Sequence, residues 1–167
     1  MRVAGALMVI LSCSVFGFSM AGSLRKRAEF LHSLVNLLTV MRNELCASLL
    51  PVRDVLGMLS QNGNGSARVF FERCLLQLEE CDFKTAWTAA ALGGRVWGMA
   101  DEECRMLAEL GGVIGRYEAE KQRELIDRTA EYFERRARFA DEEKRRQYKL
   151  RAALGIGSGL MLAILMI

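Results

Sequence analysis

Apolar residues form two uninterrupted blocks, one near each end of the chain. Residues 3–24 carry no charged side chain, and neither do residues 152–167. As helices these blocks would measure roughly 33 and 24 Å, against a hydrocarbon core of about 30 Å. The second block is short, but Leu150 extends it if the Arg151 side chain reaches back to the interface. We therefore interpret residues 1–24 and 152–167 as an N-terminal and a C-terminal transmembrane helix.

Each block has a rival interpretation. Arg2 and the small-residue stretch Ser19-Met20-Ala21 also fit a cleaved signal peptide. The basic triplet that follows at residues 25–27 argues against this, because such clusters resist translocation. A run as short as residues 152–167 also fits a buried core helix, but its last residues, LMLAILMI, have no polar face to present to water.

Basic side chains flank both blocks on the side of the central segment: Arg25, Lys26, Arg27, Lys144, Arg145, Arg146, Lys149 and Arg151. The positive-inside rule places residues 25–151 in the cytoplasm. We expect these side chains to face the membrane and contact anionic lipid headgroups. The alternative is that they act only as topology signals during insertion.

The central segment, residues 25–151, has apolar residues at three- and four-residue steps, which is typical of amphipathic helices. Glycine-rich or proline-containing stretches separate them, and Ser66 and Asp101 are expected N-caps. The pattern predicts six helices over residues 25–48, 51–60, 66–80, 83–92, 101–110 and 116–151.

Both predicted spans must enter one membrane, so the first and last of these helices must meet it at the same end. An up-down bundle satisfies this only with an even number of helices, and six agrees. The predicted fold is all-α: a six-helix antiparallel up-down bundle between two transmembrane helices. The turns near residues 50–51, 82–84 and 111–115 then lie far from the membrane, and those near residues 63–65 and 97 lie close to it.

Apolar periodicity also predicts the core. The expected core residues are Leu34, Leu38, Leu45, Val55, Phe70, Leu75, Leu78, Trp87, Leu107 and Phe133. On the last helix a narrow stripe is expected through Leu125, Thr129, Tyr132 or Phe133, Arg136 and Phe139.

Composition argues against enzymatic chemistry. The five cysteines form no CxxC pair, and there is one histidine, so neither a metal cage nor a disulfide framework is indicated. The loop at residues 61–66 lacks the GK[ST] ending of a phosphate-binding loop. The pair Glu102-Glu103 is expected on an exposed helix face, and a net charge of +3 is too small to imply nucleic acid. We expect no catalytic activity, metal, cofactor, nucleic acid or small-molecule substrate.

Several motifs occur in a familiar order. They are Glu44 with Pro51-x-Arg53 and Leu56, then Lys84-Thr85-Ala86-Trp87 with Val96-Trp97, then Leu110-Gly111-x-x-x-Gly115-x-x-Glu118-x-x-x-Gln122, and a charged helix before the last apolar block. Together they resemble the stage III sporulation protein AB family of endospore-forming bacteria over essentially the full length. Glu118 departs from the aspartate expected after the glycines.

The resemblance implies a function. The family is similar to the cytoplasmic six-helix domain of the inner-membrane platform protein of type II secretion systems. Its members are implied to belong to the mother-cell membrane complex that joins mother cell and forespore, with a secretion-type ATPase and other channel proteins of the same operon. A scaffold that couples the ATPase to the membrane channel is therefore expected. The alternative is a generic membrane-anchored helical adaptor or regulator unrelated to secretion.

A cytoplasmic partner is expected at the end far from the membrane. Phe83 and Tyr117 are aromatic residues beside turns there, and the glycines at 111, 112 and 115 leave space for a shallow groove. The predicted groove consists of Pro51, Asp82, Phe83, Lys84, Gly111, Gly112, Gly115, Arg116 and Tyr117. The alternative is that Phe83 and Tyr117 only fasten the ends of their helices.

Overall fold

The computed structural model describes the backbone of residues 2–166 and the side chains of residues 24–146. It contains six α-helices, a 3-10 turn, and no strand within residues 2–166. The elements are α1 (Arg2–Cys46), α2 (Val52–Asn62), α3 (Arg68–Gln77), α4 (Phe83–Leu92), η1 (Gly93–Trp97), α5 (Asp101–Leu110) and α6 (Ala119–Met166). The all-α prediction is confirmed.

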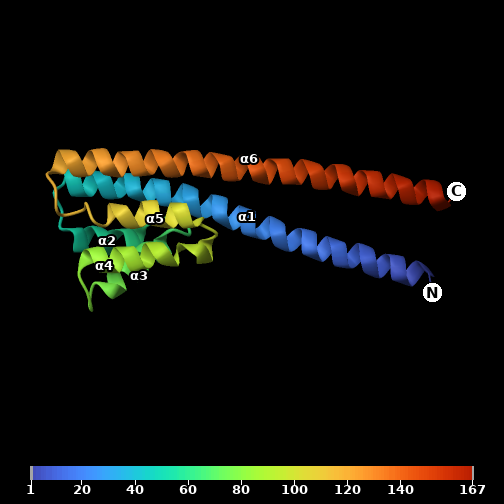
Figure 1. Cartoon of the computed structure of the whole chain (residues 1–167), viewed down its shortest axis with the longest axis horizontal. Helices are drawn as coiled ribbons and strands as arrows, with labels where there is room; N and C mark the ends of the chain where they lie inside the picture. The colour runs from blue at the N-terminus through green and yellow to red at the C-terminus, as the bar shows by residue number, and fades with distance from the viewer. Residues whose placement is uncertain (1, 167) are drawn as a thin grey trace.

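The two long helices form one side of the molecule and the four short helices form the other (Figure 1). α1 and α6 run antiparallel and side by side, and both termini lie at the same end of the molecule. We call the end of the bundle that faces the two termini the near end, and the opposite end of the bundle the far end. Gly65 lies against Ser33 and Gly98 against Arg27 at the near end, whereas Gly115 lies beside Val52 at the far end. The turns therefore fall at the ends that the parity argument assigned to them.

Within the residues whose side chains the structure describes, no helix has an apolar stretch long enough to cross a membrane. The predicted spans, residues 1–24 and 152–167, lie outside that part of the chain apart from Leu24. Their assignment stays a prediction.

The helix starts differ in part from the sequence-based expectation. Asp82 caps α4, because its carboxylate accepts hydrogen bonds from the Thr85 hydroxyl at 2.6 Å and the Thr85 amide at 3.4 Å. The Thr85 hydroxyl holds the pKa of Asp82 below its usual value. Ser66 is not a cap: Ala67 precedes α3, and its amide donates to Ser33 Oγ at 3.1 Å. Asp101 is the first residue of α5 and not its N-cap.

Trp87 is the centre of the core formed by the short helices. Its ring is fully buried and meets Phe70 edge-on at a centroid distance of 4.8 Å, while its Nε1 donates to the Leu107 carbonyl at 2.6 Å. Most of the predicted core residues are buried: Leu34, Leu38, Leu45, Val55, Phe70, Trp87, Leu107 and Phe133. Leu75 and Leu78 are only half-buried, because Phe71 and Cys74 take the inward positions of α3.

The predicted stripe on the last helix is confirmed at Thr129 and Phe133 and is wrong at its two ends, Leu125 and Phe139. The buried face of α6 consists of Ile126, Thr129, Phe133, Ala137 and Ala140, and Phe139 is 63% exposed. Two of these residues are alanines, whose small side chains allow α6 to approach α1 closely. The sequence pattern favoured the larger aromatic at 139, although the packing selects the small neighbours on either side of it.

The described cysteines, at 46, 74, 81 and 104, are free thiols. Cys74 and Cys104 are buried, and burial raises the pKa of Cys74 to about 12. Desolvation also raises the pKa of Cys104 and of Cys46. The thiols of Cys46, Cys74 and Cys104 are therefore neutral at physiological pH, as expected of small apolar packing residues.

We predict that Trp87→Ala will destabilise the bundle by about 3–5 kcal/mol, because it removes a fully buried indole and leaves a cavity. A protein of this size would then lose roughly 6–20 °C in thermal midpoint. The measurement is thermal unfolding of the purified full chain, followed by circular dichroism. Leu76→Ala is the control, since Leu76 is 63% exposed; an equal midpoint for the two variants would contradict the central role of Trp87.

Candidate functional site

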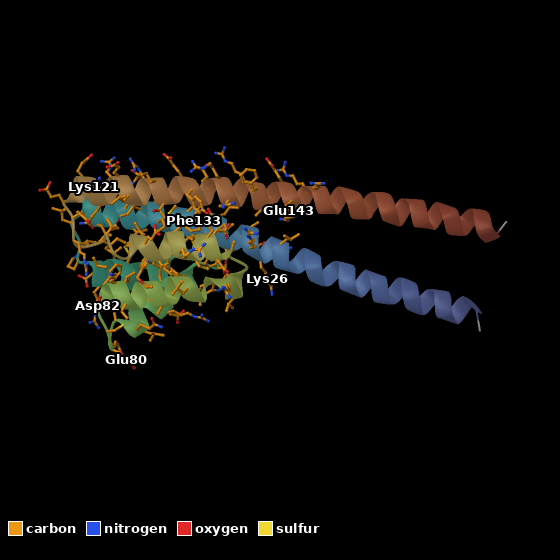
Figure 2. The ribbon with its side chains drawn as sticks, viewed as in Figure 1. Lys26, Glu80, Asp82, Lys121, Phe133 and Glu143 are labelled. Atoms are coloured by element: carbon orange, nitrogen blue, oxygen red, sulfur yellow. The ribbon has the colours of Figure 1, made fainter. Side chains whose placement is uncertain are left out.

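The predicted membrane-facing basic residues do not all behave alike. Arg25 and Lys26 are exposed on α1, and Lys144, Arg145 and Arg146 are exposed on α6. Figure 2 shows Lys26 and Glu143 towards the near end of the bundle, with Asp82 and Lys121 at the far end. The side chains of Lys149 and Arg151 lie outside the described residues.

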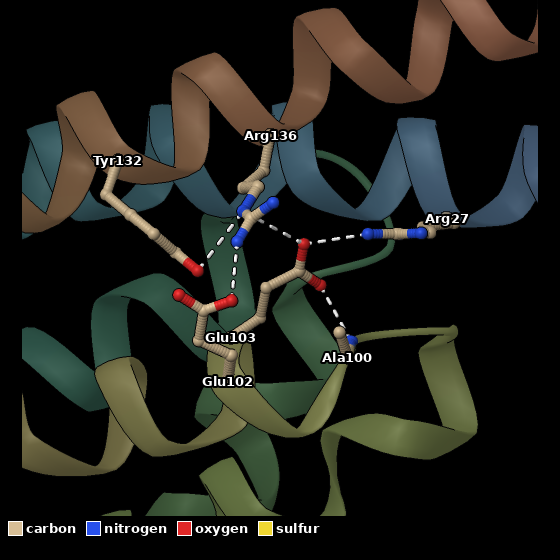
Figure 3. A network of polar contacts seen from close by, with 6 residues as sticks. All are labelled: Arg27, Ala100, Glu102, Glu103, Tyr132 and Arg136. Atoms are coloured by element: carbon tan, nitrogen blue, oxygen red, sulfur yellow. Dashed lines mark hydrogen bonds and ion pairs between the residues drawn. The ribbon is translucent and has the colours of Figure 1, made fainter.

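Arg27 differs from its basic neighbours because it faces the bundle. Its Nη2 donates to Glu103 Oε1 at 2.7 Å, and the Glu103 side chain is fully buried. The other Glu103 oxygen accepts the Ala100 amide at 2.8 Å, which satisfies a free N–H at the start of α5 (Figure 3). One buried carboxylate therefore ties α1 to the first turn of α5. The expectation that Arg27 points to lipid does not agree with this geometry.

Arg136 brings α6 into the same group of side chains. Its Nη2 donates to Glu102 at 2.7 Å and its Nε to the Tyr132 hydroxyl at 3.1 Å, while the Nε also lies 3.8 Å from Glu103 Oε1. The Tyr132 hydrogen bond and the two glutamates raise the pKa of Arg136. We call Arg27, Glu102, Glu103, Tyr132 and Arg136 the Glu103 cluster (Figure 3).

The charges of the Glu103 cluster explain what it can do. Two arginines face two glutamates, so the cluster is neutral as a whole, and its charged groups are engaged with one another. Arg27 Nε is buried and has no hydrogen-bond partner among the described residues, so the guanidinium is partly desolvated. A buried carboxylate that loses its cation is strongly destabilising. The cluster therefore fixes three helices relative to one another at the near end.

Sequence reasoning missed this cluster because it placed Glu102 and Glu103 together on an exposed face. Glu102 is exposed, but Glu103 is fully buried, so the expectation was wrong for Glu103. The tertiary structure decides this, since η1 carries the start of α5 underneath α1. A weak signal was present: a glutamate in the third position of a helix often accepts the amide of the residue before the helix.

Two further polar contacts join α1 to α6 on the solvent side. His32 Nε2 lies 2.7 Å from Asp141 Oδ2, and Arg42 Nη1 donates to Asp127 Oδ1 at 2.6 Å. All four side chains are at least a quarter exposed, so each pair adds little to stability. The pairs lie about ten residues apart on α1, and both are compatible with the antiparallel register of the two helices.

The structure brings the predicted far-end residues together. A Cβ built on Gly112 would lie 3.9 Å from Lys84 Cε, and one on Gly115 would lie 4.0 Å from Val52. The side chains of Pro51, Asp82, Lys84, Arg116 and Tyr117 are exposed there. The α2, α4 and α6 starts therefore share one surface.

The predicted opening at Gly111 is filled. A Cβ at this glycine would lie 2.4 Å from Trp87 Cδ1, so the missing side chain makes room for the indole and not for a partner. Phe83 packs on the same indole, with ring centroids 5.4 Å apart, and is half-buried. Of the two aromatic residues predicted for the groove, Phe83 packs into the core at the start of α4, whereas Tyr117 is 54% exposed.

A different apolar residue is exposed at the far end, and sequence reasoning did not identify it. Leu49 follows α1 with φ +52° and is 71% exposed. Non-glycine residues rarely adopt this left-handed backbone, which here turns the chain from α1 towards α2. No pattern in the sequence indicates that Leu49 is exposed, and its accessibility in the folded chain shows it.

The glycine motif has a structural reason in the turn before α6. Gly115 has φ +77°, and its amide donates to Gln122 Oε1 at 3.1 Å. The Gln122 amide group donates in turn to the Tyr117 carbonyl. One glutamine side chain therefore closes the turn on both sides and fixes where α6 begins.

The chain was compared with known proteins. It matches the model of the stage III sporulation protein AB family over residues 2–167. Neither a curated protein nor a solved structure matches it.

We predict that Glu103→Ala will cost about 2–4 kcal/mol, because it leaves the half-buried Arg27 without its anion and Ala100 without its acceptor. The neighbouring Glu102→Ala should cost at most about 1 kcal/mol, since it removes an exposed ion pair. Urea unfolding of the full chain measures both. Glu103→Gln keeps a side-chain oxygen for Ala100 and should fall between them; equal stability of the two alanine variants would disprove the role of Glu103.

We predict that Gly111→Ala will destabilise the bundle by roughly 1–3 kcal/mol, because the added methyl group overlaps the Trp87 ring. Gly57→Ala is the matched control: it lies within α2, and a Cβ there meets nothing within 4 Å. That control should stabilise the chain by about 0.5–1 kcal/mol through helix propensity. The same urea titration compares them, and stabilisation by both substitutions would mean that Gly111 leaves open space after all.

Proposed function

The chain belongs to the stage III sporulation protein AB family, and from this premise we propose that it is a non-enzymatic platform of the membrane complex between mother cell and forespore. The family assigns it a role in sporulation. In the proposed role the protein couples a cytoplasmic secretion-type ATPase to other channel proteins of the complex. Residues 1–24 and 152–167 would cross the mother-cell membrane, and residues 25–151 would lie in the cytoplasm.

One observation carries the proposal: α1 and α6 leave the bundle at the same end, where Arg27 and Glu103 join α1 to α5. A bundle that is attached to a membrane through two helices at one end has its opposite end directed away from the membrane. The apolar, uncharged blocks at residues 3–24 and 152–167 support this orientation, as do the exposed basic residues beside them.

The Glu103 cluster supports a platform role because it resists bending at the attachment. A force applied to the short helices at the far end reaches α1 through the Arg27–Glu103 pair and α6 through Arg136. Packed cores transmit displacement because they are dense and hardly compressible. The short helices and the long helices would then move as one body.

The far end is the proposed docking site of the ATPase. Lys84, Arg116 and Tyr117 are exposed there, and Leu49 adds an apolar side chain that is 71% exposed. Tyrosine and arginine are enriched in protein interfaces, so the exposed Tyr117 and Arg116 suit the docking of a protein. A generic membrane-anchored adaptor remains the alternative function, and it would use no specific residues at this end.

We predict that the double substitution Lys84→Glu and Arg116→Glu will abolish spore formation while leaving folding and membrane insertion intact. Both side chains are exposed, so their charge reversal should change the free energy of unfolding by no more than about 1 kcal/mol. Spore counts, together with immunoblots of membrane fractions, measure the effect.

The control reverses two arginines on the outer face of α6, Arg128→Glu and Arg135→Glu, which changes the net charge by the same amount. This strain should sporulate normally. Normal sporulation of the far-end double mutant at normal protein level would contradict docking at the far end, and equal loss in both strains would indicate a nonspecific charge effect.

A further inference from the structure

The turn η1 exposes apolar side chains at the near end of the bundle. Val96 is 75% exposed and is the most exposed of the large hydrophobic residues with described side chains; Leu92, at the end of α4, is 53% exposed. Neither belongs to the Glu103 cluster or to the far-end surface. Single exposed aliphatic side chains are common on protein surfaces, but Leu92 and Val96 occur on a segment that rests against α1 close to the uncharged block.

The turn is held rigidly against α1. The Trp97 ring stacks on Phe30 with centroids 4.8 Å apart and an interplanar angle of 6°. The Arg73 guanidinium lies 5.0 Å from the Trp97 centroid, which adds a cation–π contact. Gly98, with φ +80°, brings the backbone onto the Arg27 side chain, where a Cβ would lie 3.3 Å from that of Arg27. Val96 is therefore presented by a fixed support at the level of residues 27–30.

This level can be related to the start of the uncharged block. Arg27 and Phe30 follow Leu24 by three and six residues, or roughly 5 and 9 Å along the helix axis. The headgroup layer of a bilayer is about 5–8 Å thick on each side. If the hydrocarbon core begins at Leu24, the turn that rests on residues 27–30 meets the headgroup layer.

The charges around the turn suit that layer. Arg95 is exposed but paired with Asp101 at 2.6 Å, so its charge is largely balanced. Arg73 is exposed and its guanidinium lies over the ring of Trp97, the residue after Val96; Lys26 is exposed and precedes Arg27, against which Gly98 packs. Aliphatic side chains with adjacent cations are the composition of interfacial membrane contacts.

We propose that η1 is a third membrane contact, in which Leu92 and Val96 enter the headgroup layer of an anionic lipid surface. The inference rests on the proposed membrane attachment through residues 1–24 and 152–167. With two helices and one turn in contact, the bundle is held at three points and cannot pivot about the line between α1 and α6. The orientation of the far end relative to the membrane is thereby fixed.

The test uses the full chain in vesicles of phosphatidylcholine and phosphatidylglycerol, with and without bromine on the upper part of the acyl chains. Val96→Trp provides the probe, and Leu92→Trp repeats the measurement at a second exposed position. Leu76→Trp is the matched control. Leu76 is 63% exposed, but it lies at the C-terminal end of α3, away from η1. The emission of the wild-type chain, which has Trp87 and Trp97, is subtracted from each variant.

We expect the brominated lipid to quench the added emission of Val96→Trp and Leu92→Trp, and to shift it to shorter wavelength, but not that of Leu76→Trp. The effect should be stronger with phosphatidylglycerol than in phosphatidylcholine alone. Thermal unfolding of each variant checks that the substitution leaves the bundle folded.

Flotation of the wild-type chain with the vesicles separates the two proposals. If the chain floats but Val96→Trp and Leu92→Trp are quenched no more than Leu76→Trp, the η1 contact is disproved and membrane attachment stands. If the chain does not float, both are disproved.

Discussion

Antiparallel packing of α1 against α6 is the constraint on which the rest of the molecule depends. It brings both ends of the chain to one end of the bundle and leaves the four short helices only one side of α1 to cover (Figure 1). Close approach is possible because α6 contributes Ala137 and Ala140, which follow Phe133, to its buried face. Since the core behind α1 is built on this pair, the position of every turn follows from it.

The Glu103 cluster extends this constraint to the short helices. A carboxylate without solvent contact is tolerated only when its charge and its lone pairs are engaged. Arg27 supplies the charge and the Ala100 amide fills the second oxygen. The same residue therefore caps α5 and joins α5 to α1, so local helix geometry and tertiary contact depend on one side chain.

The two ends of the bundle have different chemistry, and this supports a directional scaffold. At the near end the structure combines a neutral buried ion-pair cluster with exposed lysines and arginines and the aliphatic residues of η1. At the far end Trp87 packs tightly against Gly111, and Leu49 and Tyr117 are exposed. In the proposed function the first end meets lipid and the second meets protein, and the rigid core between them relates the two.

The sequence by itself determined the helices, their number and the end at which each turn lies. These follow from apolar spacing and from the requirement that two uncharged blocks leave at one end, which are local or topological properties. It could not determine which of Phe139 and its alanine neighbours faces α1, why Gly111 is needed, or that Glu103 is buried beside Arg27 while Glu102 is not. Those outcomes depend on how closely two helices approach and on where a 3-10 turn carries the next helix. Only the packed structure decides such distances, because residues far apart in the chain compete for the same space.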